Sequence, residues 1–203
     1  MLFLKGLAFG FVLAATVGPM WVLCLRRTLA SGALAGLASG MGIAVADGLY
    51  GAVAAFGLTA ISGFLLAQQR LLALVGGGFL VYLGAKALLA RPAALEGGPS
   101  ETPLRSLATA FVSTLGLTLA NPPTILAFIA IFAGLGLGSS GNFAEASLVV
   151  LGVFLGSASW WAILAGTAGR LRARLGPGLA RGVNAVSGLT ILGFALWQLA
   201  QLF

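Results

Sequence analysis

A long apolar segment, Leu107 to Leu137, is interrupted near its middle by Asn121, Pro122 and Pro123. A membrane-spanning helix needs roughly 20 apolar residues, so this segment can cross a bilayer and also contain an irregular break. Proline lacks a backbone N–H and clashes with the carbonyl four residues earlier, so the pair cannot lie inside a regular helix. Proline is accepted in the first turn of a helix, and asparagine is a favourable N-cap. We therefore predict two half-helices, the second beginning at Pro122 inside the membrane.

A break of this kind favours a binding site. The N-terminus of a half-helix carries a partial positive charge and unpaired N–H donors, which together favour an anion such as a carboxylate. Broken helices near the bilayer midplane are one way in which transporters build a substrate site. The alternative is a proline kink that neighbouring helices repair, without a ligand. This segment by itself does not decide between the two.

The composition places the whole chain in the membrane. Of its 203 residues, 60% are hydrophobic and only 7% are charged, too few to solvate the surface of a soluble domain. The chain has no His, and Cys24 is its single cysteine, so the usual transition-metal ligands, a redox cysteine pair and the usual catalytic triads are all missing. We expect neither an enzyme nor a cofactor or metal site. The net charge of +7 indicates membrane topology before it indicates a nucleic-acid partner, and we expect none.

The apolar segments predict an all-α membrane protein with six transmembrane helices. The predicted spans are Leu2–Leu25, Ala33–Ile61, Leu71–Ala90, the broken Leu107–Leu137, Ala146–Ala168 and Val183–Phe203. Arginines gather in the loops after spans one, three and five, the first of which holds Arg26 and Arg27, whereas the opposite side holds Lys5 and Arg70. Cytoplasmic loops carry an excess of Lys and Arg, so we expect both termini outside.

The two halves of the chain resemble each other. Gly18-Pro19 in the first span matches Asn121-Pro122 in the fourth, and spans two and five both carry glycines spaced by four. We predict two inverted three-helix repeats, residues 1–90 and 106–203, joined by a cytoplasmic loop at residues 91–105. Transporters of this design place the substrate site at the repeat interface.

Broken helices are therefore expected in spans one and four. The predicted substrate-binding residues flank the two breaks: Thr16, as a cap or hydroxyl ligand, with Gly18, Pro19, Asn121 and Pro122.

Asp47 is the one carboxylate that we place well inside a membrane segment. A charge there is costly and normally faces a polar interior. Desolvation favours the neutral form of a carboxylic acid, so we predict that Asp47 couples transport to protons or pairs with the ammonium of a substrate. The alternative is a hydrogen-bonded aspartate with a structural role.

Other polar side chains are weaker candidates for the cavity wall, and hydrogen bonding to their own helix is the simpler role for several of them. These candidates are Tyr50, Ser113, Thr114, Thr118 and Ser159. Trp21, Trp160 and Trp161 are predicted to be interface anchors or packing residues, and Trp197 and Gln198 to lie near an interface.

Four stretches in order along the chain resemble the LysE/RhtB family of amino-acid exporters. They are AATVGP around Gly18-Pro19, GLASGMGIAVADGLYG around Asp47, GGGFLVYLGAKAL in the third span and ANPPTILAF in the fourth. The resemblance implies a six-span exporter of the bacterial inner membrane, driven by the proton gradient and dimeric. Two positions depart from the family pattern: Val17 stands where members commonly have proline, and Pro123 where they commonly have lysine.

The predicted function is secondary active export of amino acids or related small zwitterions across the inner membrane, by proton antiport and alternating access. The predicted partners are the amino-acid substrate, protons, the lipid bilayer and a second copy of the chain. One alternative is a cation or metal-ion exporter of the same superfamily, which would normally show more intramembrane acids or His. The other is a membrane scaffold without transport, which the paired breaks disfavour.

Overall fold

The computed structural model describes residues 1–56, 59–89, 104–121, 124–129, 143–172 and 177–202, and these ranges contain helices and no strands. Within them, four helices include a stretch long and apolar enough to cross a membrane: α3 (Ala33–Ala55), α5 (Gln69–Leu88), α8 (Phe143–Arg172) and α9 (Pro177–Ala200). The helices α1 (Leu2–Ala15) and α2 (Pro19–Ser31) meet the same criterion as one bent pair, whereas the apolar α6 (Leu104–Leu119) is shorter. The chain is therefore a multi-pass α-helical membrane protein.

The predicted break in the first span is confirmed, since α1 and α2 meet at 74°. Gly18 is extended, with φ −153° and ψ −175°, and Pro19 begins α2, where a missing N–H costs no intrahelical bond. Thr16 does not cap α2, because its hydroxyl donates back to the carbonyl of Leu13 in α1. The N-cap position belongs to Gly18.

The first span continues past its predicted end. Arg26 and Arg27 lie within α2 and not in a loop, and α2 joins α3 through Gly32 alone. Gly32 has φ +93°, and no other described residue has a positive φ. Glycine adopts this conformation without a Cβ clash, so it turns the chain in one residue and carries the two arginines into the helical bundle.

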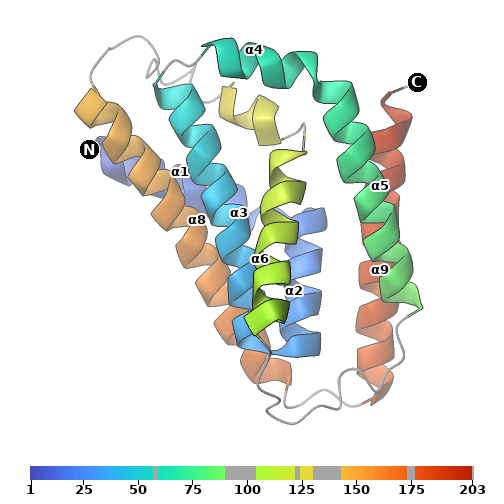
Figure 1. Ribbon diagram of the computed structural model, residues 1–203. Coiled ribbons are helices and arrows are strands. Elements are labelled where there is room, and N and C mark those ends of the chain that lie inside the picture. The colour runs from blue at the N-terminus through green and yellow to red at the C-terminus, as the bar shows by residue number, and fades with distance from the viewer. Residues whose placement is uncertain (57–58, 90–103, 122–123, 130–142, 173–176, 203) are drawn as a thin grey trace.

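The second span ends earlier than predicted. Helix α3 stops at Ala55 with Phe56 as its C-cap, and the rest of the predicted span belongs to a separate helix, α4 (Thr59–Ala67). Figure 1 shows α4 lying across the upper end of the bundle. The fourth span is also interrupted, because α6 ends at Leu119 and helix resumes at 124–129. Pro122 and Pro123 lie outside the described residues.

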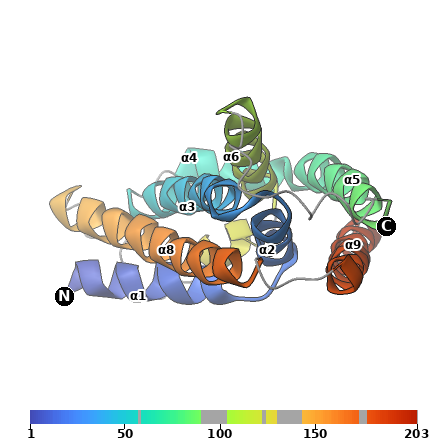
Figure 2. The same ribbon diagram turned by 90° about the horizontal axis from the view of Figure 1, so that it is seen from below.

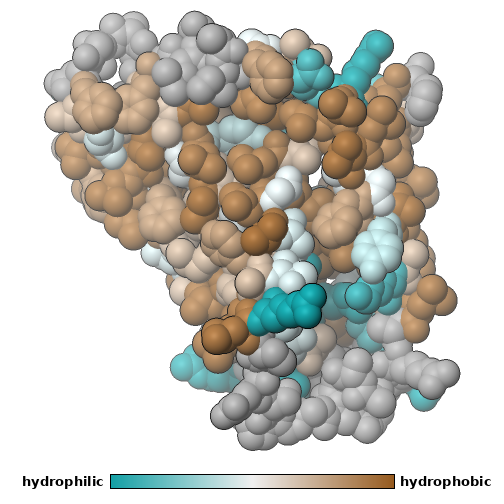
Figure 3. Space-filling model, in the orientation of Figure 1, coloured by the Kyte–Doolittle hydropathy of each residue, from teal (hydrophilic) through white to brown (hydrophobic). Residues whose placement is uncertain are grey.

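The helices form two groups (Figures 1 and 2). Helix α3 is central, with α8, α6 and α2 packed around it, and α1 lies along α8. Helices α5 and α9 form a second pair, which meets the first group mainly through α2 and α9. Figure 3 shows a broad apolar surface, with polar side chains gathered near the start of α6 and at the corner between α4 and α5.

Small residues bring α1 and α8 into backbone contact. A Cβ on Gly6 or Gly10 of α1 would collide with the backbone at Val149 or Val153 of α8. A Cβ on Gly152 or Gly156 of α8 would collide in turn with the backbone of α1. Without a hydrophobic driving force between helices in lipid, close van der Waals packing of this kind drives association.

A half-buried guanidinium ties three helices together. Nη1 of Arg27 in α2 donates to Oγ of Ser39 in α3 (3.1 Å) and to the carbonyl of Ala110 in α6 (2.9 Å). Its Nη2 donates to Oγ of Ser113 (2.8 Å). All three acceptors are neutral oxygen atoms. The guanidinium reaches them because its N–H donors are held in a fixed planar arrangement, which the ammonium of lysine lacks.

Replacing Gly10 with Leu is expected to destabilise the fold by about 1–3 kcal/mol or more, as overpacking does. The readout is the apparent melting temperature in detergent, followed by size-exclusion fluorescence. The matched control is Gly78→Leu in α5, where a Cβ meets nothing within 4 Å. Equal melting temperatures for the two variants would contradict the backbone contact between α1 and α8.

Replacing Arg27 with Lys is expected to lower stability by about 1–3 kcal/mol, because the ammonium cannot reach all three acceptors and leaves buried groups unsatisfied. The same thermal assay measures the loss. Arg181→Lys, at an exposed position of α9, is the control and is expected to melt like the parent. An unchanged melting temperature for Arg27→Lys would mean that the junction adds nothing to the fold.

Candidate functional site

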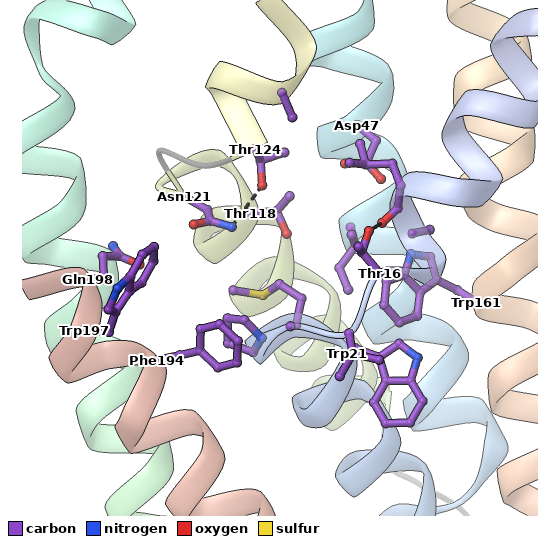
Figure 4. Close-up of a pocket in the computed structure, with 18 residues that line it drawn as sticks. Thr16, Trp21, Asp47, Thr118, Asn121, Thr124, Trp161, Phe194, Trp197 and Gln198 are labelled. Carbon is purple, nitrogen blue, oxygen red and sulfur yellow. Dashed lines mark hydrogen bonds between the residues drawn. The ribbon is translucent and has the colours of Figure 1, made fainter. Parts of the chain in front are cut away.

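One cavity of about 300 Å³ lies where the two interrupted helices meet the core (Figure 4). Side chains from α1, α2, α3, α6, α8, α9 and residues 124–129 line it, and they include one carboxylate and no Lys or Arg. The polar and aromatic members of the wall are Thr16, Trp21, Asp47, Thr118, Asn121, Thr124, Trp161, Phe194, Trp197 and Gln198.

The start of α2 forms one side of the cavity. Gly18, Pro19, Met20 and Trp21 all line it. The first N–H groups of a helix have no intrahelical acceptor and carry the positive end of the helix dipole. This opening suits an anionic group, and the bend between α1 and α2 makes it face the cavity.

The break of the fourth span lies across the cavity from the first break. The carbonyl of Asn121 accepts the N–H groups of Thr124 (3.1 Å) and Ile125 (3.4 Å), so Asn121 occupies the start of the next helical turn. Its side-chain amide donates to the hydroxyl of Thr124 (2.9 Å). Both side chains line the cavity. Two of the predicted site segments, far apart in sequence, therefore share one space.

Asp47 lies in the same wall. It is 3% exposed, and Oγ of Ser157 in α8 donates to its Oδ2 at 2.7 Å. The hydroxyl donor stabilises a carboxylate, while the cavity side leaves room for a proton or a cationic ligand. Asp47 therefore combines a fixed hydrogen bond from α8 with a position in the cavity wall.

Three buried polar atoms around the cavity have no hydrogen-bond partner in the described part of the chain. They are the hydroxyl of Thr118 and the indole N–H groups of Trp21 and Trp161. Thr118 and Trp161 are each 2% exposed. A buried donor without an acceptor costs free energy, so these groups are able to form hydrogen bonds that the described protein atoms do not supply.

The weaker cavity candidates separate into two groups. Thr118 lines the cavity, whereas Tyr50, Ser113, Thr114 and Ser159 lie elsewhere. Tyr50 donates to the carbonyl of Leu119 (2.6 Å), a helix-end group with no intrahelical partner. It thus stabilises the break without lining the cavity.

Of the other three, two form hydrogen bonds between helices and one bonds to its own helix. Ser113 accepts the hydrogen bond from Arg27, and Thr114 donates to the carbonyl of Ser39 (2.7 Å) across the contact between α6 and α3. Ser159 is exposed and donates to Leu155 one turn earlier (2.6 Å). The partner of Asp47 is therefore Ser157, two positions from the residue that the repeat pattern selects.

Trp161, Trp197 and Gln198 line the cavity, although the sequence patterns assign them to packing or to a membrane interface. Trp161 is packed against Gly40, and Gln198 is 8% exposed. Gly40 and Asp47 have heptad spacing and so lie on the same face of α3. The helix that packs against Gly40, α8, therefore also faces Asp47. This spacing is the one sequence signal for Trp161. No comparable signal marks Gln198.

Within the described ranges, no three His, Cys, Asp or Glu side chains lie close enough together to hold a metal ion. The donors around the cavity are hydroxyl, amide, indole and carboxyl groups. This set offers a ligand several hydrogen-bonding groups and one acidic side chain.

Comparison with known proteins places this architecture in a family. The sequence model of the LysE family, described as LysE type translocator, matches residues 11–201. The chain is also 27% identical over 202 residues to the Bacillus subtilis (strain 168) protein named "Putative amino acid efflux protein YcgF", an alignment covering 97% of this chain and 94% of that protein. No solved structure matches. The chain belongs to the family of LysE type translocators.

Proposed function

We propose that this translocator exports amino acids or related small zwitterions across the bacterial inner membrane by proton antiport and alternating access. The observation that carries the proposal is that both helix breaks and Asp47 line one cavity. Its volume of about 300 Å³ suits a small ligand, at the lower end of the ~300–1,000 Å³ range of small-molecule sites. The efflux activity in the name of the Bacillus subtilis relative supports the same class of substrate.

In this mechanism, the substrate carboxylate binds at the start of α2, and the ammonium binds at Asp47. Substrate arriving from the cytoplasm displaces a proton from Asp47 to the cytoplasm. After the substrate leaves on the outer side, Asp47 takes up a proton from that side. The Ser157 hydroxyl holds the carboxyl group in place through both states. Each turnover then moves substrate out and a proton in.

Inverted repeats are part of the proposal, with residues 1–90 and 106–203 as the two units and 91–105 as the cytoplasmic loop. A two-fold axis between the halves would relate the first span to the fourth, the second to the fifth and the third to the sixth. The contact of α1 with α8 would then correspond to the contact of α6 with α3. The same exchange leaves the α3–α8 and α5–α9 contacts unchanged. All four contacts are present, as a two-fold relation between the halves requires.

The orientation is proposed from charge. Both termini lie in the upper part of Figure 1, and α8 ends at the lower end with Arg170 and Arg172. The positive-inside rule then places the lower end in the cytoplasm and both termini outside.

We also propose a homodimer, and this part of the proposal rests on the family resemblance alone. The cation-exporter and scaffold alternatives are distinguished from it by transport assays that include divalent metals.

Replacing Asp47 with Asn is expected to abolish transport driven by a pH gradient while leaving the fold intact, because the amide cannot release a proton. The measurement is counterflow of labelled amino acids of every class in proteoliposomes, with and without the gradient. Acceleration of one class by the gradient in the parent, and its loss in the variant, is the expected result. Full gradient coupling in Asp47→Asn would exclude Asp47 as the proton carrier.

Replacing Ser157 with Ala is expected to raise the half-saturating substrate concentration at least about tenfold, since a hydrogen bond to a charged group contributes roughly 1.5–3 kcal/mol. The half-saturating substrate concentration is the readout. The matched control is Ser159→Ala, on the same helix but exposed and bonded to its own backbone, which should behave like the parent. Equal effects of the two substitutions would remove Ser157 from the site.

A further inference from the structure

A second cavity, of about 510 Å³, lies at the outer end of α9. Residues from the end of α4, the start of α5, the end of α9 and the 124–129 helix line it, among them Ala67, Gln69, Arg70, Leu126 and Gln201. We call this space the outer vestibule. Its wall contains the cation of Arg70 and the amides of Gln69 and Gln201, so it suits a group with a negative charge and several hydrogen-bond acceptors.

The outer vestibule and the central cavity have two wall residues in common, Trp197 and Gln198. Both come from α9, and Figure 4 shows them together at one margin of the central cavity, on the far side of Asn121 from Asp47. Trp197 is 55% exposed and Gln198 only 8% exposed. Among the described residues, these two side chains are therefore the ones that take part in both walls.

Gln198 is held in this position through one weak contact. Its Nε2 donates to the carbonyl of Ala73 in α5 at 3.2 Å. That carbonyl lies within a helix, where it already accepts an N–H from four residues later. The side-chain bond is therefore an additional one, and breaking it leaves no backbone group unsatisfied.

The rest of the contact between α5 and α9 has no such freedom. A Cβ on Gly77 would meet the side chain of Leu199 at 2.8 Å, and one on Gly84 would meet that of Leu192 at 2.7 Å. A Cβ on Gly188 would likewise approach Leu88 at 2.7 Å. Close packing keeps the two helices together, so opening at the outer end requires side-chain rotation and not separation of the helices.

We infer that Trp197 and Gln198 form the outer gate of the translocator, through which a zwitterionic substrate passes from the central cavity to the vestibule, where Arg70 receives its carboxylate. This inference rests on the proposed function for the identity of the substrate, and on the geometry of the two cavities for the gate itself. Rotation of the Gln198 amide away from Ala73 and displacement of the Trp197 ring join the two spaces.

Cysteine labelling tests the gate without any substrate. In a Cys24→Ala background, Ala127→Cys places a thiol in the central cavity and Ala67→Cys places one in the vestibule. A membrane-impermeant methanethiosulfonate is added either to spheroplasts or to inverted vesicles. The preparation used is the one in which the reagent labels Ala67→Cys, because that thiol marks the side of the membrane on which the vestibule opens. Slow labelling of Ala127→Cys beside fast labelling of Ala67→Cys is expected for the closed gate.

Removing the gate side chains should then open the central cavity. Gln198→Leu, which removes the amide and keeps a side chain of similar size, is expected to raise the Ala127→Cys rate about fivefold, the effect of losing one hydrogen bond. Trp197→Ala, which removes the ring, is expected to raise the rate at least as much. Both substitutions leave the Ala67→Cys rate unchanged. The control is Leu196→Ala, 61% exposed in the adjacent position and outside both cavities.

Equal rates at the two thiols in the parent, or rates that neither substitution changes, would overturn the gate. The labelling experiment contains no substrate, so its outcomes are independent of the counterflow assay. Failure of counterflow for every amino acid would overturn the proposed function and leave the gate standing.

Discussion

The structure depends on the rule that a chain in lipid must satisfy its own backbone polar groups. Irregular backbone is therefore tolerated only where protein or a polar cavity surrounds it. Both interruptions obey this rule: residues 16–18 and Asn121 line the same cavity, and the hydroxyl of Tyr50 binds the end carbonyl of α6 at Leu119. The polar groups that the breaks supply are thus accommodated partly by neighbouring side chains and partly by the cavity.

Glycine packing provides the rigid frame around this cavity. Gly10 and Gly156 allow backbone contact between α1 and α8, and α8 also packs on α3, where Ser157 reaches Asp47. The neighbouring Gly40 accommodates the ring of Trp161. A buried acid in a membrane is costly unless it is hydrogen-bonded or faces a cavity, and Asp47 meets both conditions only because the helices approach so closely.

The two ends of the molecule differ in how they are held. Around Arg27, three hydrogen bonds join α2, α3 and α6 within the bundle. Around Gln198, one hydrogen bond to an already paired carbonyl of α5 adds to the glycine packing that holds α9 and α5 together. In the proposed gate, rotation of the Gln198 side chain breaks this one hydrogen bond and leaves the packing of the two helices in place.

The sequence by itself determined where the helices are interrupted, because Pro19 and the Asn121-Pro122-Pro123 stretch exclude regular helix whatever surrounds them. It also determined that Asp47 is buried, since an acid in the middle of a long apolar segment has no solvent to reach. The tertiary structure decided which side chains meet. Ser157, not Ser159, binds Asp47, and Trp161 and Gln198 face the cavity, because the rotation of each helix about its axis is set by packing between residues far apart in the chain. The end of α3 at Ala55 has the same origin: an apolar run shows that a segment can enter the membrane, but only its neighbours decide where the helix stops.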